Sequence, residues 1–542
     1  MKLLSKNILW GLAFLTVGVA WIFGLFIDLT GDAGLYAVIS RQMVVSGDWL
    51  NLQINDELYD QKPHLLFWLA ALGIELFGNL NFAFKLFPFL FALSSLWFVY
   101  QLGRLLFSQE AGLTAALIVG TSQMFFLYLL DIHTDTILQA GITLALWQLI
   151  AYLEKGKTGH FIWGFIGIGL AMLAKGPVGA VLPFFTVLIY LIVKKDFRQL
   201  FHPKWILGIM IVLVVISPTL WHLFQSFGWE GIRFYFITNN FGRVTGEYAG
   251  SSNDPFFYLY NMLWAFLPWT LIVLAALWFE IKSWFTSAKI HPARAAILGS
   301  VLILLFVYSI SKGKAPHYFL IMVAPLAVVT AGHLPEFKNM ALKRGRSFLC
   351  LQGLVLTVIF LVFIAVVFFL SEKLTWMPVF LLALLFVLSW VFTQKEQDSW
   401  KRLLFFSIIV TGVFNIFMNA EFIPGLFRYQ GARQALEVFE ENRKPGDKLY
   451  NFALVEYELF FMADETVEDI KVPQRLYKLL ESDETWVYTN QIKLNDITRN
   501  MEYKIDTVYV IRQRGMNQLT RQFLNPGTRE KSLTANYLIK AK

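Results

Sequence analysis

Long apolar runs are the feature that most constrains the fold of this chain. Runs of about 18 or more mostly apolar residues recur up to about residue 420 of 542, and each can cross roughly 30 Å of hydrocarbon as a helix. Charged residues make up only 15% of the chain, against about 25% in soluble proteins. The many short alternating segments typical of a membrane barrel are not seen. The sequence therefore predicts an all-α polytopic membrane bundle.

The apolar runs predict about thirteen transmembrane helices. They are expected at residues 8–28, 81–103, 110–130, 134–153, 160–174, 177–193, 204–222, 256–280, 294–310, 316–334, 347–370, 376–393 and 403–420. With these spans, most loop Lys and Arg residues fall on one side of the membrane, which is consistent with the positive-inside rule. The apolar segment 63–79 is interpreted as a helix at the outer surface, because a fourteenth span would place the N-terminal lysines opposite the other cations.

Both ends of the chain have a predicted location. The first apolar run is interpreted as an uncleaved span, since its apolar core of about 20 residues has no small-residue cleavage site. An odd number of spans then puts the C-terminus outside. From residue 427 the composition changes, and "ETWVYTN" and "DTVYVIRQ" predict strands. We expect a membrane domain at 1–426, with its first outer loop at 29–80, and a small soluble α/β domain at 427–542.

Ionisable residues gather on the predicted outer face. The first loop, "GDWLNLQINDELYDQKPHLLFWL" (47–69), is rich in them. The same face carries Asp32, Asp131, His133, Asp135, Lys175, Arg233, Arg243, Glu247, Lys312, Lys314, His317 and Tyr318. Ionisable groups at membrane depth are costly and usually mark a pathway or a site. The alternative for any one of them is an interfacial anchor or a snorkelling side chain.

Three of the cations lie beside breaks in the apolar pattern. Lys175 precedes Gly-Pro-Val-Gly, Lys314 precedes the sequence Ala-Pro-His-Tyr, and Lys62 precedes Pro63. Irregular backbone at membrane depth is tolerated where it lines a cavity, although proline in a first helical turn is also ordinary. The breaks therefore favour an outward-facing cavity.

The acidic residues allow more than one interpretation. Asp32 is a candidate general base, or it caps the helix that follows Thr30 and Gly31. Asp131 and Asp135 would share one face of a continuous helix, with His133 pointing elsewhere. An Asp-x-His-x-Asp pattern can hold a metal, but too few ligands converge in the sequence to assign one. We therefore assign no metal ligand and no certain cofactor, and a divalent metal stays open.

The combination of cations, carboxylates and an apolar bundle indicates a chemistry. Lys and Arg at membrane depth suit a phosphate group, a nearby carboxylate suits a base for an attacking hydroxyl, and the bundle suits a lipid tail. The sequence has neither nucleotide-binding glycine signature, and its net charge of +8 follows from the cationic inner loops rather than from a nucleic-acid partner. Transfer from a lipid-phosphate carrier is the predicted reaction.

A set of motifs in order resembles a known family. They are "GDAGLYA", the 47–69 loop, "HTDTILQAGITLALW", "LAMLAKGPVGAVLP", "FYFITNNFGRVTGEY", "DPFFYLYNMLWAFLPW" and "SKGKAPHYFLIMVAPLAV". The chain resembles membrane glycosyltransferases of the GT-C class, in the branch of the dolichyl-phosphate-mannose–protein mannosyltransferases and, more closely, the bacterial lipid A aminoarabinose transferases. The resemblance covers about residues 31–330.

The resemblance implies a fold, a donor and residue roles. It implies thirteen spans with a soluble outer C-terminal domain, a bacterial inner-membrane location and a polyprenyl-phosphate-linked sugar donor. It makes Asp32 and Asp135 the catalytic candidates. The substrate-binding candidates that it implies are Tyr59, Lys62, Arg243 and Tyr318, and Lys175, Lys314 and His317 join them because they lie beside the Pro and Gly breaks. Lys62 and Arg243 would stabilise the leaving phosphate.

This chain departs from the family pattern at Leu35, Gln61 and His64, where a basic residue, an acid and a proline are common. These departures bear on the sugar and the acceptor rather than on the reaction. The acceptor is a lipid A-type glycolipid, another glycan or a protein. The rivals are a flippase for lipid-linked sugars, which would need charges at span centres and paired broken helices, and a structural or sensor protein.

Overall fold

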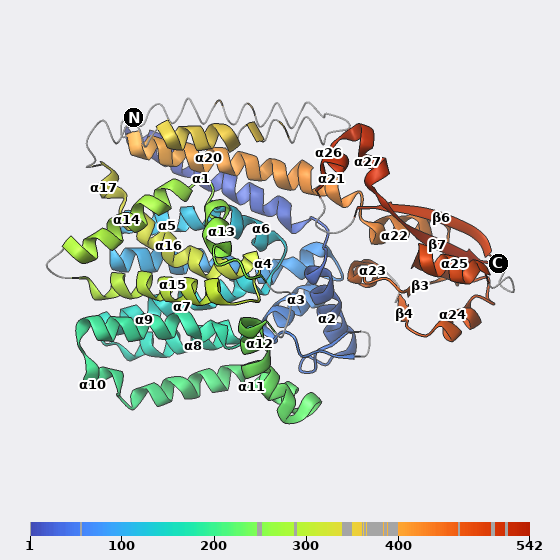
Figure 1. Cartoon of the computed structure of the whole chain (residues 1–542), viewed down its shortest axis with the longest axis horizontal. Coiled ribbons are helices and arrows are strands. Elements are labelled where there is room, and N and C mark those ends of the chain that lie inside the picture. The colour runs from blue at the N-terminus through green and yellow to red at the C-terminus, as the bar shows by residue number, and fades with distance from the viewer. Residues whose placement is uncertain are drawn as a thin grey trace.

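The computed structural model describes residues 2–54, 57–246, 252–286, 290–338, 350–359, 361–362, 365, 383, 387, 399–463, 467–499, 505–514 and 519–542. Long helices form one body, and a sheet near the C-terminus stands at one end of it (Figure 1). The N-terminus, α10 (Phe197–Leu200) and α17 (Leu334–Lys338) lie at the opposite end of the body, left in this view.

The helical body is that of a multi-pass membrane protein, as predicted. Among the described residues, six helical stretches are long and apolar enough to span: Asn81–Leu106, Thr134–Lys155, Thr158–Lys175, Phe197–Thr238, Pro292–Ile310 and Trp400–Phe427. Two bent pairs raise the number to eight: Gln109–Thr121 with Gln123–Leu130, bent by 58°, and Phe257–Ala265 with Thr270–Thr286, bent by 119°. The span predicted at 347–370 is described only in part, at residues 350–359, 361–362 and 365, and of the span predicted at 376–393 only residues 383 and 387 are described.

The helices of this body have the following bounds: α1 (Lys2–Leu25), α4 (Asn81–Leu106), α5 (Gln109–Thr121), α6 (Gln123–Leu130), α7 (Thr134–Lys155), α8 (Thr158–Lys175), α9 (Val178–Lys194), α11 (Lys204–Arg233), η1 (Phe234–Thr238), α12 (Asn239–Thr245), α13 (Phe257–Ala265), α14 (Thr270–Thr286), α15 (Pro292–Ile310), η2 (Pro316–Phe319), α16 (Leu320–Gly332), α20 (Ser399–Phe417), η3 (Met418–Phe422) and α21 (Ile423–Phe427).

The hairpin of α7 and α8 fixes the position of the site. Small residues let the two helices approach closely: a Cβ added to Gly141 would lie 2.7 Å from the Ala171 nitrogen, and one added to Gly167 would lie 2.7 Å from the Ala145 nitrogen. Gly156, with φ 71°, ends α7 in a short turn. The start of α7 and the end of α8 therefore lie at the same end of the bundle.

The first loop folds as α2 (Asp32–Ser46), the hairpin of β1 (Gln53–Ile54) with β2 (Glu57–Leu58), and α3 (Leu65–Phe77). The 13 residues of α3 extend about 20 Å, less than the roughly 30 Å of a bilayer core, which agrees with a surface helix. His64 ties the loop to α11: its Nδ1 lies 2.8 Å from the Thr219 hydroxyl, and its Nε2 lies 2.7 Å from the Leu50 carbonyl oxygen.

The C-terminal part forms a five-stranded mixed sheet in the order β4-β3-β5-β7-β6. Its elements are α22 (Gly431–Asn442), β3 (Lys448–Phe452), α23 (Tyr457–Met462), β4 (Glu468–Ile470), α24 (Pro473–Leu479), β5 (Thr485–Asn490), α25 (Gln491–Arg499), β6 (Ile505–Gln513), α26 (Arg521–Leu524), α27 (Pro526–Ser532) and β7 (Thr534–Ala541). β4 and β5 pair parallel to β3, whereas β7 pairs antiparallel to β5 and β6. The strands predicted at "ETWVYTN" and "DTVYVIRQ" are confirmed as β5 and β6.

The sheet part contacts the first loop through α23, which packs beside α2 (Figure 1). The Arg41 guanidinium of α2 donates to the carbonyl oxygens of Phe460 at 2.8 Å and Ala463 at 3.0 Å. The Gly31 N–H, at the start of α2, donates to the Glu458 carboxylate at 2.6 Å. The C-terminal part therefore holds the helix that begins with Asp32.

Candidate functional site

A cavity of about 90 Å³ lies where the ends of α7, α8, α12 and η2 meet. Four of the predicted site residues line it together: Lys62, Asp135, Lys175 and Tyr318. The rest of the lining is Leu138, Val178, Asn239, Asn240, Val244, Tyr308, Ser311, Gly313 and Ile321. The cavity therefore presents two ammonium groups and a carboxylate beside phenols, amides and apolar side chains.

Asp135 and Lys175 form a buried ion pair in the cavity wall. Lys175 Nζ lies 2.7 Å from Asp135 Oδ1 and 2.6 Å from Oδ2, and the two side chains are only 13% and 1% exposed. The same ammonium lies 4.6 Å from the centre of the Tyr318 ring. Asp135 lies in the first turn of α7 and Lys175 is the last residue of α8. Each charge is therefore opposite in sign to the partial charge of its own helix end, which stabilises it.

The segment between α6 and α7 differs from the sequence prediction. The prediction that Asp131 and Asp135 share a helix face is wrong, because α6 ends at Leu130 and α7 begins at Thr134. Ile132 has a positive φ of 47° in the break. His133, expected to point elsewhere, lies between the two acids: its Nε2 is 3.5 Å from Asp131 Oδ2 and its Nδ1 is 3.6 Å from Asp135 Oδ2.

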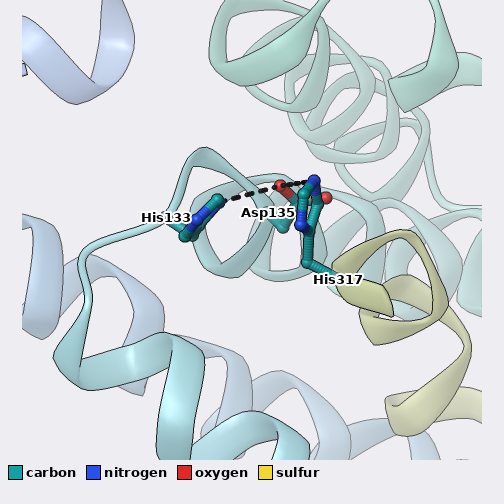
Figure 2. Close-up of side chains that lie close together, drawn as sticks. All are labelled: His133, Asp135 and His317. Atoms are coloured by element: carbon teal, nitrogen blue, oxygen red, sulfur yellow. Dashed lines mark ion pairs between the residues drawn. The ribbon is translucent and has the colours of Figure 1, made fainter. Parts of the chain in front are cut away.

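His317 joins this group from a distant part of the sequence. Figure 2 shows His133, Asp135 and His317 converging, with both imidazoles facing the Asp135 carboxylate. His317 Nε2 lies 3.9 Å from Asp135 Oδ2, and the two imidazole centres are 4.7 Å apart. His317 therefore lies beside Asp135 at the candidate site, although the sequence did not pair it with His133.

Asp32 is exposed and lies at the first position of α2. The helix N-cap is Gly31, one residue earlier, so Asp32 does not occupy the capping position of the alternative interpretation. The Tyr36 hydroxyl donates to Asp32 Oδ2 at 3.4 Å. Asp32 thus presents a solvent-accessible carboxylate at the start of α2.

Of the other predicted residues, Tyr59 and Lys314 are not among the described residues that line the cavity. Lys314 donates from Nζ to the carbonyl oxygens of Ser252, at 2.9 Å, and of Ser311, so it braces its own loop. Tyr59 is buried against Phe67. Arg243 belongs to α12, and its side chain lies outside the described part of the chain.

Sequence reasoning missed several polar residues of the lining. Asn239 and Asn240 follow the π-helical turn η1, and the Asn240 amide donates to the Tyr235 carbonyl at 2.8 Å. Tyr308 comes from the end of α15. The Asn-Asn pair in "FYFITNNFGRV" was a usable signal, because two adjacent amides following an aromatic run at membrane depth are costly unless they line a polar space.

Two acids at the docked α23 have perturbed ionisation. Burial and the neighbouring Glu458 raise the pKa of the Glu456 carboxyl to about 7. Burial also raises the pKa of the Glu458 carboxyl, whose oxygen accepts the Gly31 N–H. Protonation at this contact is therefore coupled to how the C-terminal part holds α2.

A larger cavity of about 310 Å³ lies elsewhere, between α5, the end of α16 and the start of α20. Its lining is mostly apolar, and its charged groups, Glu110 and Lys401, already pair at 2.8 Å. Size alone would favour it, but convergent polar groups mark a site better than volume does. The smaller cavity is the candidate site.

Comparisons with known proteins agree with the fold and with the motifs. Residues 61–222 match the profile of the family described as dolichyl-phosphate-mannose-protein mannosyltransferase. The chain superposes on ArnT from Cupriavidus metallidurans bound to undecaprenyl phosphate, with a TM-score of 0.76, 18% identity, and 98% of each chain covered. The chain has a GT-C fold. The resemblance expected from the ordered motifs is thereby confirmed.

Curated relatives share part of their length with this GT-C chain. An undecaprenyl phosphate-alpha-4-amino-4-deoxy-L-arabinose arabinosyl transferase of Enterobacter sp. (strain 638) is 28% identical over 328 residues, which cover 56% of this chain and 55% of the relative. One of Aeromonas hydrophila is 29% identical over 346 residues, which cover 60% of each. The matched segment thus spans little more than half of these relatives.

Proposed function

We propose that the chain is a glycosyltransferase that moves one sugar from a polyprenyl-phosphate donor to a lipid A-type glycolipid on the outer face of the membrane. The observation that carries this proposal is the cavity that brings Lys62 and Lys175 together with Asp135. Paired ammonium groups suit a lipid phosphate, and the fold is shared with a transferase bound to undecaprenyl phosphate.

Each site residue has a role in this proposal. Lys62, with Arg243 from α12, stabilises the charge that develops on the leaving phosphate. Asp32, the exposed carboxylate, accepts the proton of the attacking hydroxyl or orients the acceptor. Lys175 holds Asp135 in place from the end of α8, and Tyr318 covers the ammonium. Tyr59, Lys314 and His317 complete the substrate-binding set of the proposal.

A second acceptor class is a protein, which would make the chain a protein O-glycosyltransferase with the same type of donor. The match of residues 61–222 to the mannosyltransferase family favours it. A flippase of lipid-linked sugars remains the rival from another class. Mass spectrometry of glycolipids and glycoproteins from cells with and without the gene separates the acceptors.

The donor site is tested directly with purified full-length chain and an undecaprenyl-phosphate-linked aminoarabinose. Lys62→Ala is expected to lower transfer by about 10²–10³-fold, the usual cost of removing one preorganised charge stabiliser. Lys204→Ala, a basic residue at the start of α11, serves as the matched control and keeps its activity. Near-normal turnover of Lys62→Ala removes that residue from the mechanism. Movement of the lipid-linked sugar across vesicles without transfer would overturn the enzymatic proposal.

The proposed arrangement in the membrane has a test of its own. We propose a bacterial inner-membrane protein with its N-terminus in the cytoplasm and with the catalytic cavity and the part beyond residue 427 on the periplasmic side. The warrant is the one-sided distribution of loop Lys and Arg residues. Reporter fusions after Arg198 and after Lys542 should report opposite compartments; the same compartment for both contradicts this topology.

A further inference from the structure

Three potential metal ligands converge beside the cavity, two of them from the start of α7 and the third, His317, from a distant part of the sequence. Among the described residues, His133, Asp135 and His317 form the group in which one donor atom from each lies within 4.8 Å of the others. His133 and His317 are 11% and 22% exposed, and Asp135 is 1% exposed. We infer that these three side chains bind one divalent ion of the zinc class, with water or substrate oxygen as the remaining ligand.

The three donor atoms lie within 4.8 Å of one another, so the side chains must move closer together to bind such an ion. Donor atoms about 2.0–2.1 Å from a tetrahedral centre lie about 3.3 Å from one another. Asp135 Oδ2 lies 3.6 Å from His133 Nδ1 and 3.9 Å from His317 Nε2. Rotation of the two imidazoles about their side-chain bonds closes these gaps, because Figure 2 shows both rings already turned towards the same carboxylate.

Asp131 gives the group the outer partner that metal-binding histidines usually have. A ligating histidine commonly donates its second ring N–H to a carboxylate, which fixes the tautomer and makes the ligand more basic. His133 Nε2 faces Asp131 Oδ2 at 3.5 Å, while its Nδ1 faces Asp135. Asp131 therefore places the lone pair of His133 on the side where Asp135 and His317 lie.

The ligand types select the class of ion. Imidazole nitrogens suit zinc, iron, nickel and copper, whereas magnesium and calcium prefer sites made of oxygen ligands. Two imidazoles and one carboxylate with an open position form the ligand set of many catalytic zinc sites. The Tyr128 ring packs edge-on against His133 and His317, with centres 5.2 and 5.7 Å apart, so an aromatic wall holds both imidazoles.

Lys175 competes with the ion for Asp135. Its ammonium contacts both carboxylate oxygens, so a bound ion must share Asp135 with a nearby positive charge. Replacing Lys175 by an uncharged side chain should therefore strengthen ion binding. The ion would add positive charge at the wall of the cavity, which stabilises a phosphate there; that role rests on the proposed function, whereas the binding itself does not.

The experiment measures zinc binding by the purified full-length protein after chelator treatment. Titration calorimetry with zinc chloride should show one site, which His133→Ala and His317→Gln each weaken by about a hundredfold. Lys175→Met should bind about tenfold more tightly. The control is His202→Ala, which changes an exposed histidine in the turn before α11 and should bind like the wild type. Size-exclusion profiles and thermal unfolding select folded variants, and Asp135→Asn replaces any histidine variant that fails to fold.

Two outcomes would overturn the inference. One is wild-type binding no stronger than that of His317→Gln. The other is a loss of binding in His202→Ala as large as that in the site variants, which would place the ion on surface histidines. Transfer of sugar is assayed separately on the same preparations. A chain that binds zinc at this site but transfers no sugar refutes the proposed function and leaves the inference standing, and the reverse result refutes only the inference.

Discussion

The buried pair of Asp135 and Lys175 makes the sharpest prediction about this chain. Asp135 is 1% exposed and Lys175 is 13% exposed, and their charged atoms lie 2.6 Å apart. Removing one partner of a buried ion pair costs about 3–5 kcal/mol, because the other charge is left without compensation. Replacing both partners by uncharged residues of similar size is often nearly neutral. The single and double variants should therefore behave very differently.

We predict that Asp135→Asn and Lys175→Met each lower the Tm of the detergent-purified protein by about 3–5 °C. The conversion uses an unfolding entropy of about 2.1 cal/mol/K per residue, which gives roughly 1 °C per kcal/mol for a chain of this length. The double variant should lose much less stability than the sum of the two single changes. Sugar transfer should be lost in all three variants, because each one removes the carboxylate of the cavity, its second ammonium group, or both.

The matched control is Glu230→Gln, which removes an acid from the exposed pair with Arg233, whose charged atoms lie 3.7 Å apart. An exposed pair contributes about 0–1 kcal/mol, so Tm should change by no more than about 1 °C. Differential scanning fluorimetry gives the Tm values, and transfer is measured on the same samples. Strictly additive losses of stability, or an active double variant, would refute the argument that this pair is both buried and part of the site.

Three further predictions concern the first loop and the part that holds it. The Asp32→Asn variant should still bind the lipid donor but lose sugar transfer, as measured by donor-binding and turnover assays. Full activity of this variant would mean that Asp32 has only a structural role, since Asn caps helices about as well as Asp. Glu458→Ala removes the hydrogen bond from the Gly31 N–H to the Glu458 carboxylate. A hydrogen bond to a charged acceptor contributes about 1.5–3 kcal/mol, so α23 should pack less firmly on α2. The rate of amide hydrogen exchange at the start of α2 should therefore rise. The Glu456 carboxyl has a pKa of about 7 in the folded chain, against about 4.3 in unfolded peptides. It therefore binds its proton more tightly when the chain is folded. Its contribution to stability is fully present below about pH 4 and is lost as pH rises towards 7. Amide hydrogen exchange in β5 should depend on this pH change in the wild type and should lose that dependence in Glu456→Gln, when the two proteins are compared at each pH.

Much of the helical body could be predicted because the thickness of a bilayer fixes the length of an apolar run. The spans expected at 81–103, 134–153 and 294–310 correspond to α4 (Asn81–Leu106), α7 (Thr134–Lys155) and α15 (Pro292–Ile310). Of the residues beside Pro and Gly breaks, Lys62, Lys175 and Tyr318 line one cavity, and their roles stay predictions. Apolar runs and their interruptions by Pro and Gly depend only on neighbouring residues, so they can be recognised in a single sequence.

Features that depend on contacts distant in sequence could not be predicted. The strands β5 and β6 were expected, but the sheet order β4-β3-β5-β7-β6 is set by pairing between segments tens of residues apart. The docking of α23 on α2, through Arg41 and Glu458, joins positions more than 400 residues apart. His317 and His133 are brought together in the same way. Nothing in the spacing of these residues specifies such contacts.

The grouping of Asp131 and Asp135 failed for a different reason. It assumed a continuous helix, in which residues four apart share a face. The chain instead leaves the helix at Asp131, passes through Ile132 with φ 47°, and enters α7 at Thr134. A β-branched residue with positive φ is uncommon, so the conformational preference of Ile132 did not predict a break in the helix. The error is nevertheless informative, because the break is what turns His133 towards both acids.

The ion pair of Asp135 and Lys175, in contrast, can be explained by counting the residues between each of them and the turn of the α7–α8 hairpin. Gly156 marks the turn between two apolar runs. Asp135 lies 21 residues before it and Lys175 lies 19 residues after it, so at 1.5 Å per residue they stand about 31 Å and about 28 Å from the turn on antiparallel neighbours. Two opposite charges at nearly the same height, each at the helix end whose partial charge stabilises it, are expected to pair. The glycines at 141 and 167 then bring the helices close enough for contact, which is why the pair, rather than either residue alone, defines the site.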